Sequence, residues 1–365
     1  MHSIAETALI LELAKTQGFD LCGIVCAEKF PELVQYQDWL SAGYAGEMKY
    51  LNDERRREPN LAMEDLRSVI VCALNYNTAH PYSADCAASA DSGEPLGWIS
   101  RYAWGRDYHE VLWEKLNSLI VALRQQFPEP FAAKAYADTG PVAERVFAKY
   151  AGLGWLGKNT LLLNEKLGSW LFLGVILTSL DLEPTADREA GPPPDLCGQC
   201  RQCLDACPTG ALIDEYVMDA RKCISYLTIE LRGEVPKDLR QPIGWQVYGC
   251  DICQDVCPYN RDAPVTDAQE FQPRRMTNGE TLLQPKLTWL AALSEEGFRQ
   301  NFRGSAMKRT KWRGLVRNAC NALGNSNLKK GTLAHSEACG LLRKLQGSPE
   351  PLISESARWA LSRIE

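Results

Sequence analysis

The sequence predicts a multidomain α+β protein built of three parts. Its 365 residues exceed the roughly 250–300 residues at which a single hydrophobic core stops growing. Helix-like and strand-like patterns alternate in the first half, cysteines gather in the middle, and helical periodicity dominates the end. We therefore predict an α/β domain, a cysteine-rich domain and a C-terminal all-α, HEAT-like bundle, which span 1–185, 186–265 and 266–365.

The first part is expected to combine strands and helices. Runs of β-branched and apolar residues indicate strands, and apolar residues at helical spacing indicate helices. The segment 78–98 is rich in small and polar residues and is predicted to be a surface loop. We predict strands at 21–27, 67–76, 134–139 and 169–180, and helices at 1–18, 108–127 and 142–151.

Two linkers separate the parts. AGPPPD (190–195) cannot sustain a helix or a sheet, because proline fixes φ and removes a donor. PVTDAQEFQPRR (264–275) marks the second boundary. Beyond it, the helical pattern appears in LTWLAAL, GLVRNACNALGN, EACGLLRKL and SESARWALSRI.

Composition and the N-terminus favour a cytoplasmic protein. No stretch approaches the ~20 apolar residues that a membrane helix requires. The N-terminus has no basic region before its apolar residues and no twin-arginine pair. Fourteen cysteines are many for a compartment where disulfides are rare, so metal ligation is the natural explanation.

The net charge of −6 argues against indiscriminate nucleic-acid binding, but the charge is uneven. Residues 299–330, here called the basic segment, contain nine Lys or Arg and no acid, which leaves −15 for the rest of the chain. A local basic surface is therefore expected. The alternative is a solvated helical face without a partner.

Four cysteines after the first linker have the spacing of a bacterial ferredoxin. Two residues separate Cys197 from Cys200 and Cys200 from Cys203, and Cys207 follows after three more and precedes Pro208. In such a run three thiolates bind one iron–sulfur cubane and the fourth binds a second cluster. The run therefore predicts a partner run elsewhere in the chain.

The partner run begins at Cys250, ends before a proline and is one cysteine short. Cys223, in the intervening stretch, can supply the missing ligand. Eight thiolates then suffice for two [4Fe–4S] clusters in a ferredoxin-like domain. In the crossed arrangement, cluster one takes Cys197, Cys200, Cys203 and Cys257, and cluster two takes Cys207, Cys223, Cys250 and Cys253.

A structural zinc site is the alternative, because zinc ribbons also use paired cysteines two residues apart. Staged cysteines that end in Cys-Pro and occur twice are not the zinc pattern, so we favour clusters. The remaining cysteines lack ligand spacing and are expected to be buried as small apolar side chains. They are Cys22, Cys26, Cys72, Cys86, Cys320 and Cys339.

Three partial motifs are set aside. GLGWLG (152–157) matches the dinucleotide pattern, but a helix precedes it and a strand follows, which reverses the required order. With Lys158 it also approaches a P-loop, yet Asn159 stands where a hydroxyl should hold Mg²⁺. A histidine-ligated cobalamin motif starts before His109 but has Leu112 in place of glycine. We expect His109 to be a satisfied side chain on a helix.

Four long strings carry a family resemblance: SRYAWGRDYH (100–109), DTGPVAERVFAKYAGLGWLGKN (138–159), CISYLTIELRG (223–233) and YGCDICQDVCPYN (248–260). Through them the chain resembles the epoxyqueuosine reductases along nearly its whole length. The resemblance implies a cobalamin-dependent iron–sulfur enzyme whose catalytic core is similar to that of reductive dehalogenases. It also implies the last step of queuosine biosynthesis, in which the epoxide of epoxyqueuosine at the tRNA wobble position is reduced.

The same resemblance implies a mechanism and a catalytic residue. An external donor would supply electrons, the clusters would relay them, and base-off cobalamin would deliver them to the substrate. Asp138 matches the family's catalytic aspartate and would protonate the developing alkoxide. Such an acid must stay protonated near neutral pH, which burial beside a neutral cofactor could achieve. The alternative is that Asp138 caps the helix predicted at 142–151.

Residue-by-residue transfer implies a set of cobalamin contacts, and the basic segment gains a role in binding the anticodon stem-loop of tRNA. A monomer would be compatible with so large a partner. Two other function classes stay open: a reductive dehalogenase-like reductase of small molecules and a ferredoxin-type electron carrier. The implied cobalamin contacts are Arg56, Arg101, Asp138, Leu162, Leu173, Ser225, Asp251 and Ile252.

Overall fold

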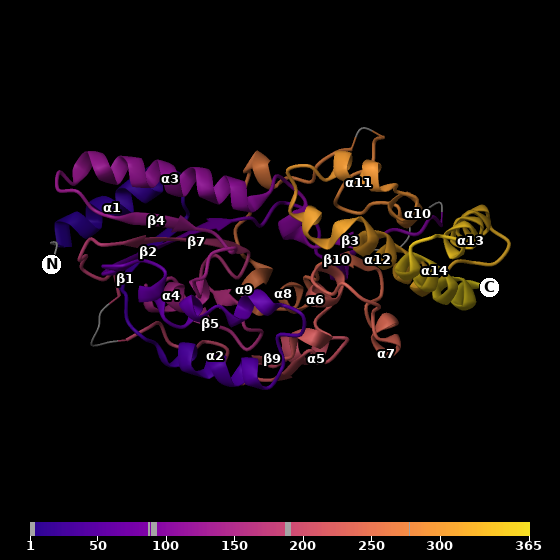
Figure 1. Cartoon of the computed structure of the whole chain (residues 1–365), viewed down its shortest axis with the longest axis horizontal. Helices are drawn as coiled ribbons and strands as arrows, with labels where there is room; N and C mark the ends of the chain where they lie inside the picture. Colours follow the sequence, from indigo (N-terminus) through magenta and orange to yellow (C-terminus); the bar gives the residue numbers. More distant parts are fainter. Residues whose placement is uncertain (1–3, 87, 89–92, 187–190, 277) are drawn as a thin grey trace.

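The computed structural model describes residues 4–86, 88, 93–186, 191–276 and 278–365 (Figure 1). Residues 87 and 89–92 of the predicted loop and Ala190 of the first linker lie outside these ranges. The described residues form a mixture of helices and strands, so the predicted mixed class is confirmed. None of the described helices is both long and apolar enough to cross a membrane.

A four-stranded sheet organises the first part of the chain. Its order is β1 (Leu21–Cys26), β2 (Ser68–Asn75), β7 (Leu171–Thr178) and β4 (Ala133–Tyr136). Every neighbouring pair is antiparallel, whereas alternating helices and strands led us to expect an α/β domain. The difference arises because β7 enters the sheet between β2 and β4, which are joined through α3 (Tyr108–Gln126).

Side chains alternate between the two faces of this sheet, as the strand period requires. Ile24, Ile70 and Ile176 are paired in register and pack toward α1 (Ile4–Thr16) and α3. Their neighbours Val69 and Leu177 point to the other face, where α2 (Pro31–Ser41) and α4 (Glu144–Tyr150) lie (Figure 1). Two helical layers therefore cover the sheet.

Short elements make up the cysteine-rich part. They surround the two Cys-Pro turns, where proline begins each following turn or helix. The strand β10 pairs in parallel with β3 of the first part, and β5 pairs with β6. The bounds are β3 (Trp98–Ile99), β5 (Trp155–Leu156), β6 (Leu162–Leu163), α5 (Gln202–Ala206), β8 (Leu212–Asp214), β9 (Val217–Met218), α6 (Ile224–Ile229), α7 (Lys237–Arg240), β10 (Gln246–Tyr248), α8 (Ile252–Asp255) and α9 (Pro258–Arg261).

Every helix or strand described in the C-terminal part is a helix. Each of the four helical patterns in the sequence coincides with one of these helices. Its core also takes in Trp98 and Trp104 from the first part and Val247 from the cysteine-rich part. Packing thus crosses the predicted boundaries, and the three-domain division stays a prediction. The helices are α10 (Leu287–Ala291), α11 (Glu295–Asn301), α12 (Lys311–Asn325), α13 (Leu333–Gln346) and α14 (Pro351–Ile364), and the 3₁₀ helix η8 (Ala306–Thr310) precedes α12.

Candidate active site and cysteine groups

The cysteines assigned to cluster one come together around a cavity. Cys197, Cys200, Cys203 and Cys257 line a space of about 210 Å³. Burial and the neighbouring Cys257 raise the pKa of Cys203 to about 11. The indole N–H of Trp155 lies 3.5 Å from Cys197 Sγ and can donate to it. Four convergent thiols in this setting fit the donor set of a [4Fe–4S] cluster.

The cysteines assigned to cluster two form a second group, and all four are partly buried. Burial raises the pKa of Cys253, and the charges of Cys223, Cys203 and Cys207 raise it further. Burial and then the charge of Cys253 act in the same way on Cys250. The backbone N–H of Ala211 donates to Cys207 Sγ over 3.3 Å. Cys203, which is assigned to cluster one, also lies near this group, so the crossed assignment of individual ligands stays a prediction.

The other cysteines divide into two sets. Cys72, Cys320 and Cys339 are buried, as expected for small apolar side chains. Cys22, Cys26 and Cys86 are only partly buried, so that expectation is wrong for them in its strict form.

Asp138 lies just beyond β4 and faces two side chains from the start of α3. Its backbone has φ +56°, a conformation uncommon for a residue other than glycine. The Tyr108 hydroxyl donates to Asp138 Oδ2 over 2.9 Å, and His109 Nε2 lies 3.2 Å from the same oxygen. The helix α4 begins only at Glu144, with Ala143 as its N-cap. The helix-cap alternative for Asp138 is therefore wrong.

Asp138 is surrounded by protein yet reachable by solvent. Its side chain is 64% exposed, although burial is the largest single influence on its pKa. The carboxyl therefore lies among protein groups and is still open to solvent. Arg145 behaves similarly, because it is exposed while burial lowers the pKa of its guanidinium. We call the solvent-exposed space beside Asp138 and Arg145 the hollow.

The protonation of Asp138 differs from our expectation. Burial alone would raise its pKa, but hydrogen bonds with His109 and Tyr108 and the charge of Arg56 outweigh it and lower the pKa. With its pKa lowered, Asp138 is an ionised acceptor near neutral pH rather than a protonated acid. Nearby Glu144 is different, because burial and the charge of Asp138 raise its pKa to about 8.

His109 has a charged partner on each ring nitrogen. Its Nδ1 lies 2.6 Å from Asp107 Oδ1, opposite the contact with Asp138. Burial disfavours the imidazolium, but the two carboxylates outweigh burial and raise the pKa of His109 to about 9. The other oxygen of Asp107 lies 2.8 Å from Lys308 Nζ. His109 is thus satisfied, as expected, but it also belongs to the site, which sequence analysis missed.

Two implied cobalamin contacts, Arg101 and Asp251, use their side chains inside the protein. The Asp251 carboxylate accepts bonds from the indole of Trp98, the hydroxyl of Ser100 and the backbone N–H of Arg101. The guanidinium of Arg101 donates to the carbonyls of three residues and lies over the ring of Trp104. Both residues are almost fully buried and fix the segment around β3.

The remaining implied contacts lie at the end of the sheet and beside cluster two. Continuing the pairing of β4 with β7 by two residues would place Asp138 opposite Leu173. Leu162 and Leu173 belong to the apolar layer under α4. Ser225 is the second residue of α6, which follows Cys223, and Ile252 packs in the same apolar cluster as that cysteine. Arg56 donates to the Val142 carbonyl and keeps a buried Nε without a partner.

An aromatic row connects the Asp138 site with cluster two. The ring of Tyr108 stacks on Phe172 with centroids 4.4 Å apart, and Phe172 stacks on Tyr76 at 4.2 Å. Burial raises the pKa of Tyr76, and the charges of Asp251 and Cys253 raise it further. The stacked rings of Tyr108, Phe172 and Tyr76 therefore extend from Asp138 toward Cys253.

The basic segment is only partly a surface. Arg317 is completely buried, so it cannot contact a nucleic acid, and its inclusion in a basic surface is wrong. Lys308 and Arg309 are exposed but pair with Asp107 and Glu230. The exposed remainder comprises Arg299, Arg303, Lys311, Arg313, Lys329 and Lys330.

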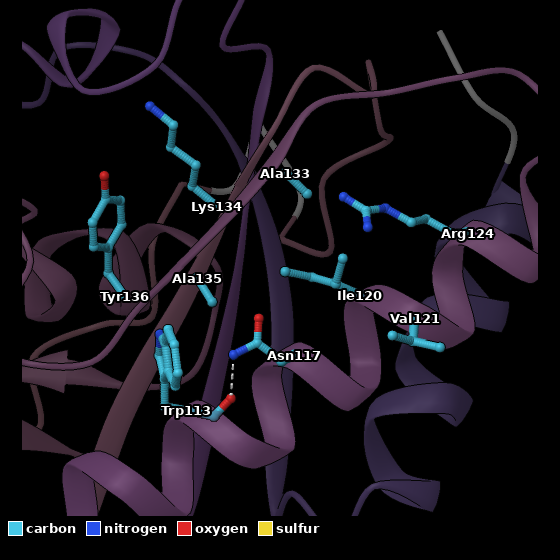
Figure 2. A pocket seen from close by; sticks show the side chains of 9 residues that line it. All are labelled: Trp113, Asn117, Ile120, Val121, Arg124, Ala133, Lys134, Ala135 and Tyr136. Atoms are coloured by element: carbon cyan, nitrogen blue, oxygen red, sulfur yellow. Dashed lines mark hydrogen bonds between the residues drawn. The ribbon is translucent and has the colours of Figure 1, made fainter.

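A second cavity, of about 330 Å³, lies between α3 and the edge strand β4 (Figure 2). Its lining combines apolar side chains such as Trp113 and Val121 with the cations Arg124 and Lys134. No carboxylate, histidine or cysteine is among the described residues around it. Lys134 and Tyr136 are the titratable side chains of this lining apart from Arg124.

Comparison with known proteins identifies the family. A model described as "Epoxyqueuosine reductase QueG, DUF1730" matches residues 56–139, and one described as "4Fe-4S double cluster binding domain" matches 196–260. An epoxyqueuosine reductase of Gloeobacter violaceus is 44% identical over 330 residues, which cover 87% of this chain and 96% of the relative. The chain belongs to the epoxyqueuosine reductase family. The Escherichia coli K12 epoxyqueuosine reductase is 37% identical over 348 residues, covering 95% and 86%.

Solved epoxyqueuosine reductases have the same fold. One was determined with an epoxyqueuosine-modified tRNA-Tyr stem loop and matches with a TM-score of 0.85 at 32% identity, covering 99% of this chain and 90% of the other. A Bacillus subtilis epoxyqueuosine reductase, in which the loop of the catalytic aspartate has swung out of the active site, gives the same values. The predicted family, the oxidoreductase class and the 4Fe–4S double-cluster domain are thereby confirmed.

Proposed function

We propose that this epoxyqueuosine reductase acts on the wobble nucleoside of tRNA and converts epoxyqueuosine into queuosine. The reaction removes the epoxide oxygen and forms a carbon–carbon double bond. It consumes two electrons and two protons and releases one water molecule. Of the function classes considered from the sequence, family membership favours this one over a small-molecule dehalogenase or an electron carrier.

One observation carries the proposal: residues of the basic segment lie next to the residues that surround Asp138. Arg309 lies over the ring of Tyr50, and the charge of Asp138 acts on the same tyrosine. Lys308 pairs with Asp107, which contacts His109, and His109 in turn contacts Asp138. A phosphate-binding surface beside a proton-transfer site suits a substrate that is one nucleoside of a folded RNA.

Base-off cobalamin is proposed as the cofactor of the hollow, where it would supply the electrons at the substrate. The chemistry of the nearby residues suits a large cofactor, since they include the apolar Leu162 and Leu173 and the unpartnered Nε of Arg56. Ser225 would contribute a hydroxyl near cluster two. Because the side chains of Arg101 and Asp251 are bonded internally, these residues would shape the wall and contact the cofactor only through their backbone.

The clusters would relay electrons one at a time from an external protein or small-molecule donor. We propose that the enzyme acts as a monomer in the cytoplasm, where its tRNA substrate is found. Asp138 would transfer protons to the epoxide oxygen. Its exposed carboxyl, held by Tyr108 and His109, is placed to meet a substrate that enters the hollow.

The test uses anaerobically purified protein. Iron and cobalt per chain are measured, and an epoxyqueuosine stem-loop is incubated with the enzyme and a reductant. Mass spectrometry should show a loss of one oxygen atom from the wobble nucleoside. Zinc in place of iron, or an unchanged nucleoside with a fully loaded enzyme, would refute the proposal.

A further inference from the structure

The stoichiometry of the reduction requires two protons at one oxygen. The first converts the opened epoxide into a hydroxyl group, and the second lets that oxygen leave as water. A single carboxyl carries one proton at a time, and Asp138 is ionised in this structure. A second proton carrier in contact with Asp138 would supply these protons within the site. This step rests on the proposed reduction of the epoxide.

His109 has the geometry of such a carrier. Each ring nitrogen meets a carboxylate oxygen, at 2.6 Å for Asp107 and 3.2 Å for Asp138. A neutral imidazole has one donor nitrogen, whereas the imidazolium donates from both. Since ionised carboxylates only accept, the arrangement is satisfied by the charged ring.

We propose that His109 is the proton reservoir of the site, a positioning residue that supplies the substrate through Asp138. The Nε2 proton moves to Asp138 Oδ2, and the Asp138 proton moves to the epoxide oxygen. The imidazole then takes a new proton from solvent, which reaches its 29% exposed side chain. No electron or other co-reactant is needed for this transfer.

Tyr108 does not fill the same role. Its hydroxyl also donates to Asp138, but burial and the charge of Asp138 raise its pKa well above the usual value. The phenol therefore keeps its proton and orients the carboxylate. The ring of Tyr108 stacks on His109 at 4.0 Å and holds the imidazole in place.

Charged groups from four other segments face this pair. Asp107 precedes α3 and accepts from the His109 backbone as well as its ring, and Lys308 of η8 neutralises the other side of Asp107. Lys308 also feels the charge of Glu110 on α3. Around Asp138 the charged groups are Arg56, Glu144, Arg145 and Arg309.

Lys308 connects the reservoir to RNA binding. It contacts the same carboxylate as His109, so in this proposal its positive charge opposes the stabilisation of the imidazolium by Asp107. When an RNA phosphate draws Lys308 away, Asp107 stabilises the imidazolium more strongly. The protonated fraction of His109 should therefore rise when tRNA binds.

The first test follows the ionisation of His109 directly by NMR in the cluster- and cobalamin-loaded enzyme. The chain has only four histidines, so selective labelling gives few signals, and His109→Gln identifies the relevant one. We expect a midpoint near pH 9. Asp107→Asn should lower this midpoint and Lys308→Met should raise it. An imidazole that titrates at its ordinary pH, near 6.5, and ignores both changes overturns the proposal.

The second test compares pH profiles of turnover. In the wild type, kcat should hold up to about pH 9 and fall above it, because the reservoir is charged below its pKa. His109→Gln keeps a donor to Asp138 but cannot hold the proton, so the fall should move into the acid range. At pH 8 we expect kcat to drop at least about tenfold with little change in KM.

The controls separate the possible failures. His335→Gln, at the start of α13, should leave the profile unchanged, and iron and cobalt contents report whether His109→Gln folds. An inactive but fully loaded wild type would refute the proposed function, while the NMR midpoint would still test the reservoir. An unshifted profile in His109→Gln with an active wild type would refute the reservoir alone.

Discussion

Replacing Arg317 with methionine should destabilise the protein without weakening RNA binding by the folded molecules. Arg317 is the one member of the basic segment that the structure buries completely. Its guanidinium donates to the carbonyls of Leu227, Leu231 and Gly233 over 2.5 to 2.8 Å. These carbonyls lie at or just beyond the C-terminal end of α6, where helix carbonyls lack internal partners. A cation there is also stabilised by the helix dipole.

The size of the effect follows from these three bonds. A hydrogen bond to a charged group contributes about 1.5–3 kcal/mol, so the three bonds together exceed about 4.5 kcal/mol. Relief from burying the charge offsets part of this, since burial lowers the pKa of Arg317 to about 10. We expect a net loss of about 3–5 kcal/mol, and a thermal midpoint lower by roughly 5–10 °C.

The assay combines thermal unfolding with stem-loop binding at matched amounts of folded, iron-loaded protein. Lys311→Met is the control, because this neighbour is exposed and has no role in the core. It should change stability by less than about 0.5 kcal/mol but reduce RNA affinity. An Arg317→Met protein as stable as the wild type, or one that is stable but binds RNA poorly, would refute the structural role.

Three further predictions concern the active site, the clusters and the basic segment. Asp138→Asn should retain iron and cobalt but lose turnover, measured as loss of epoxyqueuosine; full activity would remove Asp138 from the mechanism. Trp155→Phe deletes the donor to Cys197 Sγ and should lower the reduction potential of cluster one in a redox titration, because hydrogen bonds to cluster sulfurs raise it. Lys311→Glu with Lys329→Glu should weaken stem-loop binding and flatten its salt dependence, and an unchanged slope would contradict a phosphate contact.

Local signals in the sequence predicted most of the elements. The β-branched runs gave β1 and β2 within a residue or two, and helical periodicity placed α3 and α12. The two cysteine groups were proposed from the sequence because closely spaced cysteines that end in Cys-Pro are typical of iron–sulfur cluster ligands. In each case the pattern lies in a short segment, so no distant contact is needed to recognise it.

Contacts between distant segments were not predictable. The strand order of the sheet depends on β7 inserting between β2 and β4, and nothing local in the sequence specifies this. From the sequence, Arg317 was predicted to be part of a basic surface, because nothing local shows that its carbonyl partners lie at and just beyond the end of α6. Asp107, His109 and Lys308 lack a joint signal for the same reason, since the lysine comes from the far end of the chain.

The contacts that η8 makes with the rest of the protein suggest how one nucleoside of a large RNA would be positioned at Asp138 in the proposed function. Lys308 and Arg309 pair with Asp107 and Glu230, and the Thr310 hydroxyl donates to the Thr228 carbonyl. The basic segment is thus anchored at three consecutive residues to the active-site side, and its helices share a core with β3. A surface anchored in this way cannot swing freely. In the function that we propose, phosphates bound along it would set the distance of the wobble nucleoside from Asp138, and the fold would thereby contribute to substrate selection.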